Sequence, residues 1–108
     1  MRIVVNLRVE GFHHWPKAPE KHGFLAFNHR HEFHIRAERE VGHDDRDIEI
    51  IEFKRRIRDH LVSMFGYPCQ FGACSCEMLA RHIRDNYELE RCEVLEDGEN
   101  GAVIEKGE

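Results

Sequence analysis

The stretch NHRHEFHI, residues 28–35, decides the fold, because it opens a segment in which polar and apolar side chains alternate as on a β-strand. Successive side chains of a strand point to opposite faces, so His29 and His31 share one face with Phe33 and Ile35. Two imidazoles then project side by side. Neutral imidazole nitrogens bind Zn²⁺, and a third protein ligand would complete a catalytic site that keeps one position open. The stretch therefore predicts a strand, over 31–41, and part of a zinc centre.

The length and charge of the chain limit the classes of protein to which it can belong. A chain of 108 residues is expected to form a single domain, 1–108, with one hydrophobic core. Its 16 Lys and Arg against 21 Asp and Glu give a net charge of −5, and no basic block suggests a nucleic-acid partner. The N-terminus has too short an apolar run for a signal peptide, and no segment approaches a membrane span. A cytoplasmic protein without membrane contact is the expectation.

Apolar periodicity predicts the remaining elements. Helical spacing from Ile50 to Phe65 stops at Gly66, and Ser75 is suited to cap a second helix that carries Tyr87 on its apolar face. The predicted elements are a strand over 2–10, a long connection over 11–28, the strand over 31–41, a helix over 50–65, a helix from 75, and a hairpin of strands over 91–95 and 101–105. The order ββααββ predicts an α+β fold with a four-stranded antiparallel sheet and both helices on one face.

Four cysteines stand at positions 69, 74, 76 and 92. In the cytoplasm they are expected to stay reduced. The C-x4-C-x-C spacing of the first three differs from the C-x2-C of zinc ribbons, so buried small thiols are favoured over a second metal site. Cys76 is a minor candidate for a reactive thiol, because the start of a helix can lower the pKa of a cysteine.

Five motifs, spread over nearly the whole chain, carry a family resemblance. They are VEGFH (9–13), HRH (29–31), IEIIEFK (48–54), CSCEMLA (74–80) and CEVLED (92–97). In that order they look like F-x-A-A-H, H-G-H, V-D-F-x-x-L-K, P-T-S-E-N-L-A and V-x-V-x-E-T. These are motifs of the 6-pyruvoyl-tetrahydropterin synthase and 6-carboxytetrahydropterin synthase family, so the chain resembles that family of the T-fold superfamily.

The resemblance implies a zinc site and a ring-binding acid. His13, His29 and His31 take the places of the family's zinc ligands, with His14 as a competitor for the first place. Glu96 takes the place of the glutamate that holds a pterin or purine ring, and a carboxylate can accept both parallel donors of a 2-amino-4-oxo ring edge. The implied substrate is 7,8-dihydroneopterin triphosphate or a close relative. The implied assembly is a trimer or a dimer of trimers, with sites between subunits.

The chain departs from the family where protons are moved. The family's cysteine proton carrier stands four residues before the first histidine of H-G-H, and here that position is Leu25. An Asp-His pair does occur at 59–60, but it follows Lys54 too closely and falls within the first predicted helix. The long connection supplies other acid–base candidates, namely His14, Glu20 and His22, and these are the predicted catalytic residues.

Two functions follow from these expectations. The first is a zinc-dependent enzyme of pterin or 7-deazapurine metabolism, such as queuosine biosynthesis, that acts as a carbon–oxygen lyase. The second is a non-catalytic protein that sequesters or senses a pterin or purine nucleotide in the same pocket. A purely structural zinc site is disfavoured, because such sites are normally closed by four protein ligands and the sequence shows no evident fourth.

Overall fold

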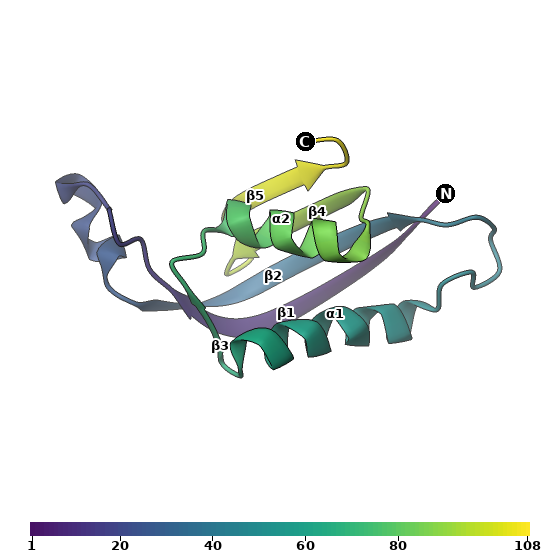
Figure 1. Ribbon diagram of the computed structural model, residues 1–108, viewed down its shortest axis with the longest axis horizontal. Coiled ribbons are helices and arrows are strands. Elements are labelled where there is room, and N and C mark those ends of the chain that lie inside the picture. The colour runs from purple at the N-terminus through teal and green to yellow at the C-terminus, as the bar shows by residue number, and fades with distance from the viewer.

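Five strands form one mixed sheet in the order β3-β1-β2-β4-β5, and the computed structural model describes the whole chain, 1–108 (Figure 1). The elements in chain order are β1 (Arg2–His13), the 3₁₀ segment η1 (Glu20–Ala26), β2 (His29–Glu40), α1 (Ile50–Phe65), β3 (Cys69–Gly72), α2 (Cys76–Tyr87), β4 (Arg91–Glu96) and β5 (Asn100–Glu105). The α+β class is confirmed. No helix is long and apolar enough to cross a membrane.

The prediction of a four-stranded antiparallel sheet is wrong, because β3 adds a fifth strand parallel to β1. It has only four residues, Cys69–Gly72, which follow Pro68, and so short a segment reads as a loop in the sequence. The pairing requires Gly11 in β1, since a Cβ there would lie 2.6 Å from the Phe71 ring. β1 runs to His13, beyond its predicted end at Glu10, because its last residues pair with β2 as well as with β3.

Both α-helices cover the same face of the sheet, as predicted, and they share one core with it (Figure 1). The buried face is set by the register, which places Val9 opposite Phe33 and Ile35 opposite Val94. The buried helix residues that complete this core are Phe53, Ile57 and Leu61 of α1 and Cys76, Leu79, Ala80, Ile83 and Tyr87 of α2. Each fully buried Leu, Ile or Phe side chain of such a core contributes about 1.5–3 kcal/mol.

The helix termini follow local sequence signals. The Ser75 hydroxyl accepts a hydrogen bond from the backbone N–H of Met78 at 3.1 Å, so it caps α2 as expected. Glu49 caps α1 through the N–H groups of Ile51 and Glu52, and Gly66 ends that helix with a φ of 79°. Ile50, which the helical spacing would place in the core, is instead half exposed, because it lies in the first turn of α1.

The opposite face of the sheet carries a network of charged side chains. At its centre Glu38 accepts from Arg2, Arg36 and Arg91, and these arginines hold the pKa of its carboxyl below the usual value despite desolvation. The outer edge of β1 is largely open, because β3 pairs only with its last residues, Gly11 to His13. The outer edge of β5 is open as well.

Candidate metal centre

Three strands bring His13, His29, His31 and Glu96 together at one end of the sheet. Each of these residues continues the buried-face alternation of its strand: His13 follows Val9 at an even spacing, the two β2 histidines precede Phe33, and Glu96 follows Val94. The core layer therefore ends in a polar group on all three strands. Phe33 forms the boundary, with its ring centroid 5.2 Å from that of His13 and 5.8 Å from that of His31.

The four side chains are close enough to share one ion. One ligand atom from each lies within 4.8 Å of the others. Glu96 Oε2 is 2.7 Å from His13 Nε2 and 3.3 Å from His31 Nε2. His13 is buried and the other three are partly buried, so the group is shielded from water on the core side.

Hydrogen bonds at the far side of each ring fix the tautomers. His13 Nδ1 lies 2.9 Å from the carbonyl of Cys74, and His29 Nδ1 lies 2.9 Å from the carbonyl of Phe27. His31 Nδ1 lies 2.7 Å from Asp97 Oδ2. Carbonyl and carboxylate oxygens only accept, so each Nδ1 must carry a proton and donate it. Each neutral ring then presents the bare Nε2 to the cluster, as metal-bound histidines do.

This arrangement leaves acceptors facing acceptors. His13 Nε2 is buried without a hydrogen-bond donor, yet it lies 2.7 Å from a carboxylate oxygen. Two acceptors at that distance repel each other unless a proton or a cation lies between them. The donor set of three imidazoles and one carboxylate suits a transition metal such as zinc. The residues present thus fit a metal ion.

A pocket of about 470 Å³ opens beside the cluster and includes His13, His29 and Glu96 in its wall. Leu25 lines it together with Trp15. Cys76 also lines it, but the expectation of a lowered thiol pKa is wrong: burial, with Glu96 nearby, raises the pKa of Cys76 to about 12. All four cysteines are free. A pocket of this size can hold a bicyclic ring.

The predicted catalytic residues lie around this pocket rather than in it. His14 follows His13 but stays outside the cluster, and its buried Nδ1 has no hydrogen-bond partner. Glu20 is exposed on η1, and His22 stacks on Trp15 with ring centroids 6.1 Å apart. Neither Glu20 nor His22 lines the pocket. The sequence reasoning gave no role to Glu77, a titratable residue that does line it, although the CSCEMLA motif contains it.

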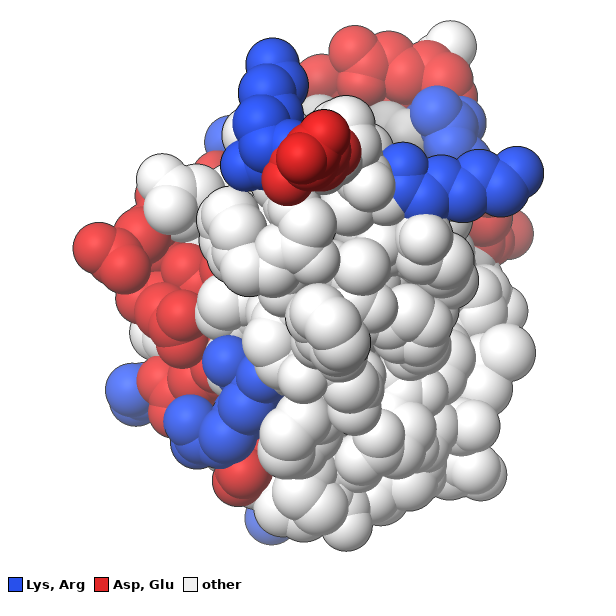
Figure 2. Space-filling view, turned by 90° about the vertical axis from the view of Figure 1, so that its left-hand side faces the viewer, with Lys and Arg blue, Asp and Glu red and all other residues white.

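The segment between β1 and β2 forms an arm that projects beyond the sheet at the end that carries the His/Glu cluster (Figure 1). It carries exposed aromatic side chains, with Phe24 70% and Phe27 76% exposed. Viewed from this end, the molecule presents a broad surface without charged side chains, with charges around its rim (Figure 2).

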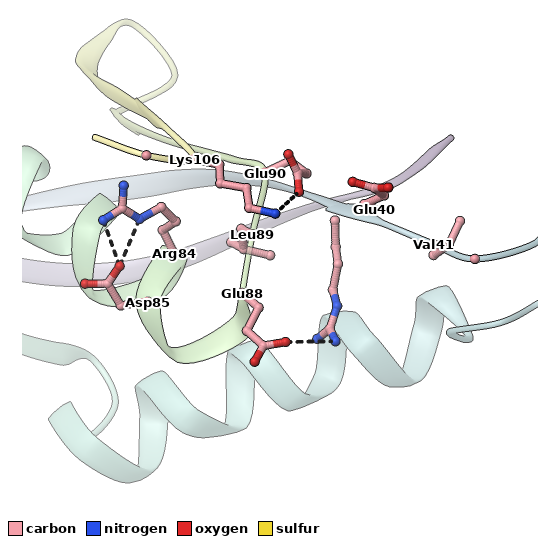
Figure 3. Close-up of a pocket in the computed structure, with 11 residues that line it drawn as sticks. Glu40, Val41, Arg84, Asp85, Glu88, Leu89, Glu90 and Lys106 are labelled. Atoms are coloured by element: carbon pink, nitrogen blue, oxygen red, sulfur yellow. Dashed lines mark hydrogen bonds and ion pairs between the residues drawn. The ribbon is translucent and has the colours of Figure 1, made fainter.

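A larger hollow, of about 670 Å³, lies at the opposite end of β2 and β4 (Figure 3). Three of its basic residues face carboxylates: Arg84 pairs with Asp85 at 2.8 Å, Lys106 with Glu90 at 3.1 Å and Arg39 with Glu88 at 3.6 Å. These ion pairs involve every charged residue of the hollow except Glu40, and its carboxylates form no cluster that could share a metal ion. The smaller pocket is therefore the better candidate site. In comparisons with known proteins, the chain matches no family model and no curated protein.

Proposed function

We propose that this protein binds Zn²⁺ through His13, His29, His31 and Glu96 and uses the adjoining pocket for a pterin or a related purine-like ring. The observation that carries the proposal is the convergence of three bare imidazole nitrogens and a carboxylate at one edge of that pocket. The family resemblance of the motifs adds dihydroneopterin triphosphate as the first substrate to test and carbon–oxygen bond cleavage as the reaction. Zinc bound there would supply Lewis acidity toward a hydroxyl or carbonyl of the ligand side chain.

The protein's own residues would bind and orient the ring. Trp15 and Leu25 offer apolar surface on the arm side of the pocket, and Ser75 and Asn100 offer hydrogen-bonding groups. Glu77 is the ionisable group of the wall that lies outside the metal cluster and is not a buried thiol, so it is our candidate for moving a proton. His14, Glu20 and His22 remain candidates if the arm closes over a bound ligand.

Glu96 cannot serve fully in both of its proposed roles. Holding the two parallel donors of a 2-amino-4-oxo ring edge requires both carboxylate oxygens, and Oε2 faces the histidines. We therefore assign Glu96 to the metal first. The substitution Glu96→Gln separates the roles: as a metal ligand it should weaken zinc binding, whereas as a ring anchor alone it should weaken ring binding and leave the zinc content unchanged.

A second candidate function is sequestering or sensing of the same ring without turnover. One residue favours it: Leu25 stands where the resembled motif has its proton carrier. Four free thiols suit a reducing compartment such as the cytoplasm under either function.

We also propose a trimer or a dimer of trimers. The open outer edges of β1 and β5 can pair with other copies. The uncharged surface at the arm could then close the pocket from a neighbouring subunit (Figure 2). Sedimentation analysis checks the assembly, and a monomer at micromolar concentration would contradict it.

The decisive experiment measures metal and turnover together. Protein purified without added metal is analysed for zinc per chain, then titrated with dihydroneopterin triphosphate and with guanine nucleotides while products are followed by mass. Near one zinc per chain with turnover supports the enzyme. Zinc with tight binding and no turnover supports the sequestering protein. Absence of zinc, in protein that also fails to take up added Zn²⁺, rejects both.

A further inference from the structure

Asp97 follows Glu96 at the turn between β4 and β5 and is tied to β2 by three contacts. Its Oδ2 accepts from His31 Nδ1 at 2.7 Å, its Oδ1 accepts from the backbone N–H of Glu32 at 2.9 Å, and its own N–H donates to the Glu32 carbonyl at 2.7 Å. Its backbone is left-handed, with a φ of 56°, a conformation in which Asp and Asn are among the few tolerated side chains. So specific a set of contacts points to a defined role.

We propose that Asp97 is a positioning residue of the metal centre: its carboxylate holds His31 as the Nδ1–H tautomer and keeps Nε2 bare for the metal. The inference rests on the proposed metal binding. It adds a residue that touches neither the metal nor the ring and acts through His31. A carboxylate behind a metal-bound histidine orients the ring and makes the ligand nitrogen more basic.

Of the three histidines, only His31 depends on a side chain for its tautomer. His13 and His29 donate to backbone carbonyls, which no substitution of the accepting residue removes. In the motif that CEVLED resembles, a threonine stands at the place of Asp97. A hydroxyl can donate or accept, so it would leave the tautomer of His31 undecided, whereas a carboxylate decides it.

Asp97 also fixes the neighbouring ligand. The paired backbone and side-chain bonds to Glu32 hold the end of β4 against β2, where Phe33 pairs with Glu96. One residue thus sets the ring orientation of His31 and the strand position that carries the Glu96 carboxylate. The two ligands it controls are 3.3 Å apart at Nε2 and Oε2.

The test compares Asp97→Asn with Asp97→Ala. Asparagine tolerates the left-handed backbone and can still accept from the Glu32 N–H, so it preserves the turn. Its amide nitrogen would then face His31 Nδ1 and donate to it. That contact moves the ring proton to Nε2, the atom that the metal needs. We expect Asp97→Asn to weaken binding of Zn²⁺ and Co²⁺ by about 10–100-fold, and Asp97→Ala by less.

This ranking distinguishes positioning from a structural role. If Asp97 only stabilised the turn, alanine would be the more damaging change and asparagine nearly neutral. Long-range ¹⁵N–¹H NMR of the metal-free protein reads the tautomer directly, and we expect Nδ1–H for His31 in the original protein and Nε2–H in Asp97→Asn. The matched control is Glu32→Gln, which removes the 2.9 Å contact of a carboxylate with His34, outside the cluster, and should leave metal affinity unchanged.

The inference is overturned if Asp97→Asn binds Co²⁺ as tightly as the original protein, or if His31 keeps its Nδ1–H tautomer in that variant. A protein that binds no metal would reject the proposed function, and the tautomer measured by NMR would still decide whether Asp97 positions His31. The two failures are therefore distinguishable.

Discussion

The protein contains two groups of closely spaced histidines, and only one of them has unpaired acceptor atoms that a cation could satisfy. At one end of the sheet, His13, His29 and His31 each donate Nδ1–H to an acceptor, and the Nε2 atoms of His13 and His31 lie 2.7 Å and 3.3 Å from Glu96 Oε2. Between the helices, His60 of α1 and His82 of α2 face each other with 2.9 Å between their Nε2 atoms. There one ring donates and the other accepts, so the pair satisfies itself.

The difference lies in the balance of donors and acceptors rather than in the number of histidines. The sheet cluster has a surplus of acceptors that a cation can satisfy, whereas the helix pair has neither a surplus nor a carboxylate among its ligand atoms. The Asp-His pair at 59–60, considered from sequence as a proton relay, belongs to the helix group and does not line the metal pocket. Substitutions in the two histidine groups test this contrast, and substitutions beside the sheet cluster test the structure around it.

The largest expected effect is loss of metal from His29→Ala. Removing one of four ligands should weaken Zn²⁺ binding by more than the 10–100-fold typical of residues behind the ligands. Chelator competition measures the affinity. The matched control is His14→Ala, which should keep its zinc because His14 lies outside the cluster. Equal zinc affinity in the two variants would contradict the assignment of the cluster.

Gly11→Ala should weaken the pairing of β3 with the end of β1 that carries the cluster residue His13. The new methyl group would lie 2.6 Å from the Phe71 ring and 3.1 Å from the Cys69 carbonyl, so β3 must shift away from β1. We expect the free energy of unfolding to fall by about 1–3 kcal/mol in urea titrations. Gly23→Ala is the control, because a Cβ there meets nothing within 4 Å. An unchanged midpoint for Gly11→Ala would argue against the pairing of β3.

Ser75→Ala should have a smaller effect, because it removes the cap of α2 at the pocket wall. The lost bond to the N–H of Met78 should cost about 0.5–2 kcal/mol of unfolding free energy. Thermal unfolding of the metal-free protein measures it, with Ser63→Ala, an exposed position in the last turn of α1, as the reference. If the two variants melt together, the hydroxyl does not cap the helix.

The pair of His60 and His82 should make the stability of the protein depend modestly on pH. Burial, followed by the neighbouring His60, lowers the pKa of His82 below its usual 6.5. The unfolded chain then binds a proton at higher pH than the folded protein, so stability is lost as the pH falls below about 6.5. Urea titrations over the pH range in which histidines usually titrate, about 5 to 7, should show a smaller loss of unfolding free energy for His82→Phe than for the original protein. An identical slope in both proteins would contradict the assignment to His82.

Much of this architecture could be predicted from the sequence, because periodicity reports burial. The spacing of Phe53, Ile57 and Leu61 predicted α1, and the alternation around Phe33 predicted β2 and the shared face of its two histidines. By contrast, β3 contributes only Cys69 and Phe71 to the core, too few positions to establish a period. The arm segment η1 has no buried residue at all, so it left no pattern to detect.

The cluster was only partly foreseeable for a related reason. Its histidines stand in motifs, and Glu96 continues the alternation of Cys92 and Val94, so the ligands can be found along the chain. The groups that hydrogen-bond to these ligands cannot be found in the same way. The carbonyl of Cys74 and the carboxylate of Asp97 meet the rings only after distant strands pair, and neither contact follows from local sequence. The same limit hid the fact that Glu96 faces the metal ligands rather than the pocket alone.

The spacing of the ligands along the chain has a consequence for how the protein folds. His13, His29 and His31 are joined by one hairpin, while Asp97, which braces His31, stands 66 residues further on. Closing the longer loop costs more chain entropy, although the cost grows only slowly with length. If the metal binds as proposed, the hairpin alone can bring three of its four ligands together before the carboxylates of Glu96 and Asp97 join them. An ion bound at that stage would favour the pairing of β1 with β2, and the later pairing of β4 would complete the site.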